Sequence, residues 1–122
     1  MKQYGYDWEA FKVTTDDNYI LTTFHILGKT GKDRPIPLKI PVLCQHGAMI
    51  DGASWLGDAD GKPFHLELVD EGFDVWIGNN RGTEYSLGHT TLSAKNDNDY
   101  WKFSWAEMGL YDDVANIKMI KT

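Results

Sequence analysis

Residues 45–49 (Gln-His-Gly-Ala-Met) are the strongest candidate for chemistry in this sequence, because they follow the apolar run 40–44 (Ile-Pro-Val-Leu-Cys). Ligands and reaction centres in open α/β sheets collect beyond the carboxyl ends of the strands. A glycine there lets the backbone approach a bound group, and the N–H after it can face a developing oxyanion. Taken alone, His-Gly is a common dipeptide, and a polar turn that ends a strand is the favoured interpretation.

Residues 78–82 (Gly-Asn-Asn-Arg-Gly) follow a second apolar run, 73–77, and we expect them to form a tight loop at the same end of the sheet. Arg81 could bind an anion there, but the favoured interpretation is an ion pair with an acidic neighbour that braces the loop. The stretch is not a phosphate-binding loop, because no Gly-Lys-Ser/Thr ending is present.

A nucleophile motif is missing from the sequence. Serine hydrolases of α/β architecture carry Gly-x-Ser-x-Gly on a sharp turn between a strand and a helix. In residues 52–57 the second glycine comes one place too late, and in residues 88–92 threonine stands at the nucleophile position. The sequence therefore offers a candidate oxyanion-binding turn without the serine that it would serve.

No metal site and no cofactor is predicted. Residues 56–67 place Asp58, Asp60, Gly61 and Glu67 at the third, fifth, sixth and twelfth positions of a calcium-binding loop. Leu56 occupies the first position, which normally supplies a carboxylate, so an acidic turn is favoured and a calcium-binding module is the alternative. The histidines show no spacing typical of zinc ligands.

Alternation and turn residues predict the elements that hold these loops. Residues 8–27 should form two strands around an acidic turn at 16–18. Residues 40–44 should form a strand covered on both faces, because the run is apolar without alternation. A helix over 63–71, stopped by Gly72, and a strand over 73–77 complete a βαβ unit. The expected class is α/β, with residues 1–122 as a single partial domain.

The last predicted element is a helix over 104–120, which follows a long irregular stretch, 78–103. Ser104 and Glu107 fit a capping box, in which each side chain satisfies a backbone N–H near the start of the helix. Leu110, Val114 and Ile117 are spaced to form one apolar face that should be buried. We expect Asp112 and Asp113 to be solvated.

Composition excludes several classes of protein. The formal net charge is −6 and the basic residues are scattered, so no nucleic-acid partner is expected. No transmembrane segment is predicted, and the N-terminus lacks the apolar core of an export signal. Cys44 lies in an apolar run, where a buried thiol is expected. None of these features assigns a cellular compartment.

Together, the segments resemble the acid lipase family of α/β-hydrolases, which includes gastric and lysosomal acid lipases. The matching segments keep the family's order: 19–21, 45–47 with Trp55, 72–82, 85–86 with His89, 100–108, and 111–112. The similarity covers nearly the whole chain. It identifies the chain as the N-terminal portion of such a lipase, ending before the strand that bears the nucleophile.

The resemblance implies a hydrolase of lipid carboxylic esters, such as triacylglycerols or steryl esters, that uses a Ser-Asp-His triad. In the family these three residues follow the region covered here, so the resemblance assigns none of them to this chain. It does place His46, Gly47 and Ala48 in the oxyanion hole, with the backbone N–H of Ala48 as one of two donors. A larger apolar residue is usual where Ala48 stands. Gly78, Asn79, Arg81 and Gly82 match a structural loop beside it.

Three interpretations therefore stand. In the leading interpretation, the chain is part of a lipase. It is inactive alone and needs a completing chain or the rest of the protein. Its rival is a non-catalytic lipid-binding or interaction module that keeps the lipase half-fold. The third is the calcium-binding module at 56–67. Family members are secreted, lysosomal or membrane-associated, so the compartment stays open.

Overall fold

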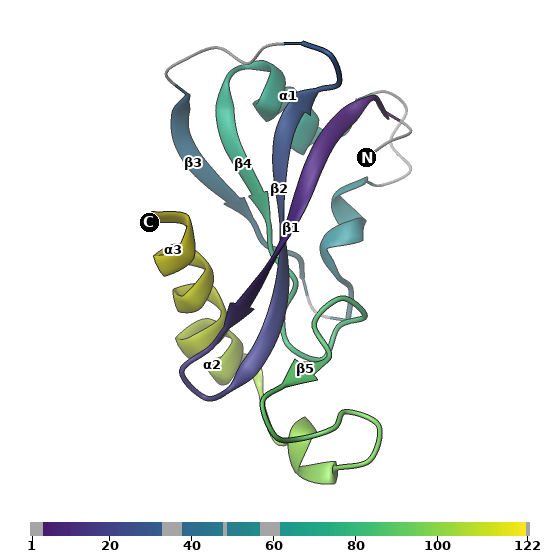
Figure 1. Ribbon diagram of the computed structural model, residues 1–122, viewed down its shortest axis with the longest axis vertical. Coiled ribbons are helices and arrows are strands. Elements are labelled where there is room, and N and C mark those ends of the chain that lie inside the picture. Colours follow the sequence, from purple (N-terminus) through teal and green to yellow (C-terminus); the bar gives the residue numbers. More distant parts are fainter. Residues whose placement is uncertain (1–3, 33–37, 48, 57–61, 122) are drawn as a thin grey trace.

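A computed structural model describes residues 4–32, 38–47, 49–56 and 62–121, and it contains one mixed sheet with helices against both faces (Figure 1). The strand order is β1-β2-β4-β3, with the short β5 also paired to β2. The strands are β1 (Tyr6–Thr14), β2 (Tyr19–Lys29), β3 (Lys39–Cys44), β4 (Phe73–Ile77) and β5 (Gly88–His89). The helical segments are 3₁₀ helices at Gly52–Leu56 and Asn98–Trp101, α1 (Phe64–Asp70), α2 (Trp105–Glu107), a π-helix at Met108–Asp113, and α3 (Val114–Lys121).

The predicted strand pair at the N-terminus is confirmed. β1 and β2 are antiparallel, and the acidic turn between them places Asn18 at a φ of 76°. Asparagine tolerates this left-handed conformation better than most residues. The Thr15 N–H donates to the Tyr19 carbonyl oxygen at 2.8 Å and closes the turn.

The predicted βαβ unit is also confirmed, since β3 and β4 are parallel neighbours and α1 lies between them in the chain. Leu66 and Val69 of α1 are buried, as the helix pattern predicted. Gly72 follows α1 with a φ of 91°, which favours glycine. The α1 face of the sheet forms one core from the following residues: Tyr6, Ile26, Cys44, Leu66, Val69, Val75 and Ile77.

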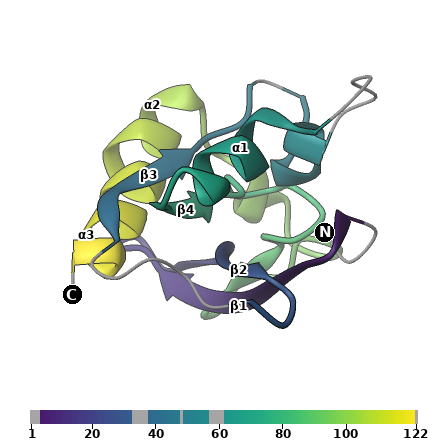
Figure 2. The same ribbon diagram turned by 90° about the horizontal axis from the view of Figure 1, so that it is seen from above.

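The opposite face of the sheet carries a second, smaller core, formed by Val13, Tyr19, Leu21 and Tyr100. Ala115 and Met119 of α3 pack against it. Figure 2 shows α1 and the α2–α3 segment on different sides of the sheet. The sheet is therefore a central layer, and the loop that carries β5 lies in the lower part of Figure 1.

The C-terminal helix differs from the prediction. Its capping box is present, with both the Ser104 and the Glu107 interactions formed. However, the π-helix at Met108–Asp113 interrupts it, and the apolar face predicted to be buried is exposed: Leu110 is 66%, Val114 38% and Ile117 49% exposed. The inward face instead carries residues 112, 115, 116 and 119, which recur at helical spacing.

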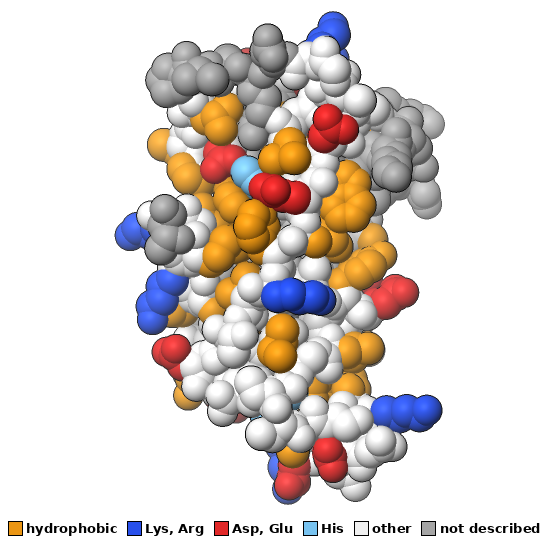
Figure 3. Space-filling view, viewed as in Figure 1, with side chains coloured by type: hydrophobic (Ala, Val, Ile, Leu, Met, Phe, Trp, Pro, Cys, Tyr) orange, Lys and Arg blue, Asp and Glu red, His pale blue; other side chains and the backbone are white. Residues whose placement is uncertain are grey.

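The prediction that β3 is covered on both faces is wrong for the described residues. Its first three residues are exposed and only Cys44 is buried, because β3 is the last strand of the described sheet. Ile40 alone is 73% exposed. The space-filling view in Figure 3 shows hydrophobic side chains at several places on one face of the molecule, among polar and charged ones.

Candidate functional site

The two candidate loops meet at one end of the sheet. Cys44 and Ile77, the last residues of β3 and β4, are paired in parallel register, so the chain leaves both strands at the same edge. The Gly78 N–H donates to the Cys44 carbonyl oxygen at 3.1 Å and joins the starts of the loops. Topology therefore brings residues 45–47 and 78–82 together, as the sequence analysis expected.

Both ring nitrogens of His46 make hydrogen bonds, one to the loop after β4 and one within its own loop. The Asn80 backbone N–H donates to His46 Nε2 at 3.0 Å, so Nε2 must be the unprotonated nitrogen. Nδ1 then carries the proton and donates to the Gly47 carbonyl oxygen at 2.8 Å. Because both nitrogens are occupied and His46 is only 9% exposed, the imidazole acts as a brace and not as a free base. Ala48, the predicted oxyanion donor, lies outside the described residues.

Asn79 fixes the second loop to the rest of the sheet. Its side chain is fully buried. Its Oδ1 accepts from the Gly52 N–H at 2.8 Å, and its Nδ2 donates to the Thr22 carbonyl oxygen at 2.9 Å. Any Cβ at Gly52 would lie 2.8 Å from Asn79 Oδ1 and 2.7 Å from Ile77 Cγ2, so only glycine fits there. The Asn79 side-chain amide thus connects β2, the loop after β4 and the 3₁₀ helix Gly52–Leu56.

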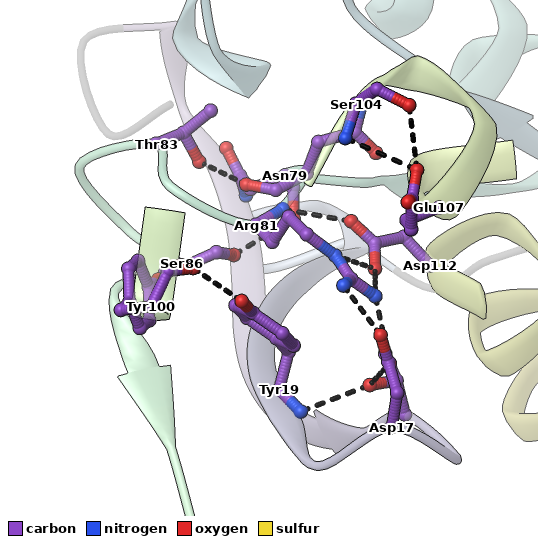
Figure 4. A network of polar contacts seen from close by, with 12 residues as sticks. Asp17, Tyr19, Asn79, Arg81, Thr83, Ser86, Tyr100, Ser104, Glu107 and Asp112 are labelled. Atoms are coloured by element: carbon purple, nitrogen blue, oxygen red, sulfur yellow. Dashed lines mark hydrogen bonds and ion pairs between the residues drawn. The ribbon is translucent and has the colours of Figure 1, made fainter. Parts of the chain in front are cut away.

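Arg81 is the centre of a buried ion-pair network (Figure 4). Three of its N–H groups donate to Asp112: the backbone N–H, Nε and Nη2, at 2.8, 2.9 and 2.8 Å. Nη1 and Nη2 donate to the Asp17 carboxylate at 2.6 and 2.8 Å. The guanidinium also lies 3.9 Å from the centre of the Tyr19 ring. Arg81 thus makes the bracing ion pair that the sequence favoured.

Burial and charge oppose one another in this network. Burial disfavours the charged guanidinium, but the hydrogen bonds that Arg81 donates to Asp17 and Asp112 outweigh it and raise the pKa of Arg81. Desolvation likewise acts to raise the pKa of Asp17, yet the hydrogen bonds from Arg81 and Thr15 lower it overall. Arg81 and Asp17 are therefore charged at neutral pH. Burial raises the pKa of Asp112, against the opposing hydrogen bonds and positive charge of Arg81.

The expectation that Asp112 is solvated is wrong. Asp112 is fully buried, because the charged Arg81 beneath the loop requires a counter-charge in the interior. Asp113 is half-buried, and burial followed by repulsion from Asp112 raises its pKa. Sequence analysis also missed the role of Asp17, which was read only as a turn residue. The available signal was Arg81, for which the sequence favoured an ion pair with an acidic residue without identifying that residue.

A cleft of about 870 Å³ opens between the two loops and the C-terminal helix. Its polar wall includes His46, Asn80 and Asp113, and its apolar wall includes Trp101 and Trp105. Trp105 is 74% exposed. The cleft therefore combines the glycine-containing turn after β3 with an apolar surface, a combination typical of sites for small organic ligands.

Other sequence candidates do not assemble into a site. Ser86 is buried, and its hydroxyl donates to the Asn79 carbonyl oxygen at 2.8 Å while accepting from the Thr22 N–H. Asp58, Asp60 and Gly61 of the calcium-loop alternative lie outside the described residues. Within the described ranges, no group of three or more His, Cys, Asp or Glu side chains could hold a metal ion. In that same part of the chain, no helix has the length and apolarity to cross a membrane.

Comparison with known proteins identifies the group to which this arrangement belongs. Residues 1–58 match the family described as "partial alpha/beta-hydrolase lipase region". The chain is 38% identical to mouse lipase member K over 117 residues, which are 96% of this chain and 29% of that protein. It is 40% identical to lipase 1 of Drosophila melanogaster over 115 residues (94% of this chain, 24% of the relative).

Two further relatives carry more specific names. Over 117 residues the chain is 38% identical to a Crotalus adamanteus protein described as a lysosomal acid lipase/cholesteryl ester hydrolase, covering 95% of this chain and 29% of the relative. Triacylglycerol lipase 1 of Arabidopsis thaliana is 38% identical over 118 residues (95% and 28%). The chain thus spans less than a third of the length of these relatives. With a mixed α/β sheet and this similarity along almost its whole length, the chain carries a partial α/β-hydrolase lipase region and is similar to lipases that include a lysosomal acid lipase.

Proposed function

We propose that this chain is part of a hydrolase of lipid carboxylic esters, such as triacylglycerols or steryl esters, in which His46, Gly47 and Ala48 line half of the oxyanion hole. The observation that carries the proposal is the pair of His46 hydrogen bonds, to Asn80 and to Gly47, which fix the turn after β3 at the edge of the apolar cleft. Pre-positioned backbone donors stabilise a developing oxyanion without reorganising.

In this proposal the Ala48 N–H donates to the oxyanion of the tetrahedral intermediate. The second donor and the Ser-Asp-His triad belong to sequence outside this chain. The strand that bears the serine would pair with β3 and cover its exposed edge. The aromatic side chains of the cleft wall, Trp101, Phe103 and Trp105, would contact the acyl chain of the ester. No cofactor enters the mechanism.

The experiment is an ester hydrolysis assay with the purified 122-residue chain and a short-chain nitrophenyl ester. We expect no turnover above the rate of the buffer, because the chain contains no Gly-x-Ser-x-Gly. Turnover that a fluorophosphonate blocks would contradict the proposal. Reading the coding sequence beyond Thr122 is the complementary test, since an in-frame Gly-x-Ser-x-Gly within roughly forty residues supports part of an enzyme.

A second candidate function is a non-catalytic lipid-binding module. The specific observation in its favour is that the chain itself has the apolar cleft, with Trp101 and Trp105 about half and three-quarters exposed. Titration of the isolated chain with oleate, followed by tryptophan fluorescence, separates the two functions. Saturable binding that Trp105→Ala weakens would support the module, and Trp8→Ala, at an exposed tryptophan outside the cleft, is the matched control.

A further inference from the structure

Four polar side chains, two just after β3 and β4 and two on the C-terminal helical segment, contain buried atoms that have no hydrogen-bond partner among the described residues. They are Gln45 (Nε2 and Oε1), Asn80 (Oδ1), Asp113 (Oδ1) and Asn116 (Nδ2). We call this group the polar seat. Gln45, Asn80 and Asp113 line the same cleft. A Cβ placed on Gly78 would lie 2.4 Å from Gln45 Oε1 and 3.4 Å from Asn116 Nδ2, so these two amides meet beside Gly78.

The polar seat is unusual because the rest of the site is closely paired. Asn79, Arg81 and His46, which lie within a few residues of it, have their hydrogen-bonding groups satisfied. An unpaired buried polar group costs about 1–3 kcal/mol, so native proteins leave few of them. Five of the eight such atoms in the described residues belong to side chains at or beside this cleft, and the other three belong to Trp55 and His65. This concentration indicates a partner from outside the described residues.

The donors and acceptors of the polar seat are complementary to backbone peptide groups. Nε2 of Gln45 and Nδ2 of Asn116 are donors for carbonyl oxygens, whereas the remaining three atoms are acceptors for N–H groups. The Gln45 amide offers one donor and one acceptor side by side, as a backbone peptide group does. The seat lies just beyond Cys44, where β3 ends, and β4 is the neighbour of β3 in the described sheet.

We infer that Gln45 and Asn116 are positioning residues that bind backbone peptide groups of the segment that extends the sheet at β3. The inference rests on the proposed function and on the length of the relatives, of which this chain spans 29% or less. Because that segment would carry the second oxyanion donor, the Gln45 amide would set the distance between the two halves of the oxyanion hole. A shift of about 1 Å at a reacting centre can cost a hundredfold in rate.

The isolated chain gives the first test. In Gln45→Met the side chain keeps its approximate volume but loses both unpaired polar atoms. We expect the melting temperature of the 122-residue chain to stay the same or rise by a few degrees, because an unsatisfied group has been removed. Asn96→Leu, at an exposed amide, is the matched control. A fall of several degrees in Gln45→Met alone would show that the amide already has its partner within this chain, and would overturn the inference.

The second test uses a full-length chimera in which this chain replaces the matched region of mouse lipase member K. Here Gln45→Met should lower kcat roughly tenfold or more with little change in KM, and should lower the melting temperature. Unchanged kcat and melting temperature would overturn the inference. A wild-type chimera that folds without esterase activity would contradict the proposed function instead, while the isolated-chain result still decides whether Gln45 has a partner.

A third measurement tests whether a second copy of this chain occupies the polar seat. Sedimentation of the isolated chain shows whether it is a monomer or a dimer. If the chain is a dimer that Gln45→Met dissociates, the occupant of the seat is a second copy of this chain, and the inference is wrong.

Discussion

Arg81 is the residue on which the polar contacts of the site converge. Its guanidinium is 1% exposed, makes hydrogen bonds to two carboxylates and lies against the Tyr19 ring. The planar fork of arginine matches both the bidentate contacts and the ring, whereas lysine offers a single point of charge. The residue therefore joins the β1–β2 turn, the loop after β4 and the C-terminal helix into one unit.

Replacing Arg81 with methionine should destabilise the chain strongly, because Asp112 would remain buried without a counter-charge. We expect a loss of about 3 kcal/mol or more in the free energy of unfolding, measured by urea denaturation. The double variant Arg81→Met/Asp112→Leu should recover part of this loss, since it removes both charges. Lys102→Met, which breaks the exposed pair with Asp99, is the control and should not move the midpoint. Equal midpoints for wild type and Arg81→Met would contradict the role of the network.

At the scale of elements, the segment Trp105–Lys121 shows how one buried charge reorients a helix. The apolar spacing predicted that Leu110, Val114 and Ile117 face inward. The π-helix at Met108–Asp113 adds a residue to the turn, and Asp112 and Asn116 face inward instead. Leaving Arg81 buried without Asp112 would cost about 3–5 kcal/mol, more than the roughly 1.5–3 kcal/mol gained by burying one leucine. The periodicity of apolar residues therefore predicted the helix but not which of its sides is buried.

The exposed side of this helix should contribute little to the stability of the isolated chain. We expect the double variant Leu110→Gln/Ile117→Gln to keep the urea midpoint of the wild type, because both side chains are already mostly in solvent. Met119→Gln, on the side that packs against the smaller core, should lose about 1–2 kcal/mol. The opposite order of effects would show that the predicted face is the buried one after all.

Across the whole molecule, the two faces of the sheet differ in how they treat ionisable groups. On one face, the buried Arg81 is paired with the carboxylates of Asp17 and Asp112. The α1 face buries His65 completely, and neither ring nitrogen has a partner among the described residues. Burial lowers the pKa of His65, so the imidazole is neutral in the folded chain.

His65 should make the chain sensitive to acid. Its ordinary pKa is about 6.5 in the unfolded chain and lower in the folded one, so the unfolded state binds the proton first as the pH falls. The stability is therefore fully present above about pH 6.5 and is lost as the pH falls toward the folded pKa. We expect the urea midpoint to drop between pH 7.5 and pH 5, and to drop less in His65→Leu.

The comparison between wild type and His65→Leu isolates this residue. Asp17, whose pKa is lowered, affects stability only at more acidic pH. Asp113, whose pKa is raised, favours the folded state as the pH falls, but it does so equally in both proteins. Identical pH profiles for the two proteins would remove His65 as the cause of acid sensitivity.

The sequence by itself determined the elements that local chemistry controls. The strand pair around Asn18, the helix between Pro63 and Gly72, and the capping box at Ser104 all depend on residues close together in the chain, so their signals are readable without the fold. The meeting of the two glycine-containing loops also followed, because parallel strands end at a common edge.

Only the tertiary structure decided which side chains are inside. Arg81 is 31 positions from Asp112 and 64 from Asp17, so no local pattern could pair them. Leaving the buried Arg81 unpaired would cost more free energy than exposing one apolar side chain, which is consistent with Asp112 and not Leu110 facing inward. For the same reason the polar seat at Gln45 appears only in three dimensions, where its unpaired atoms come together beside Gly78.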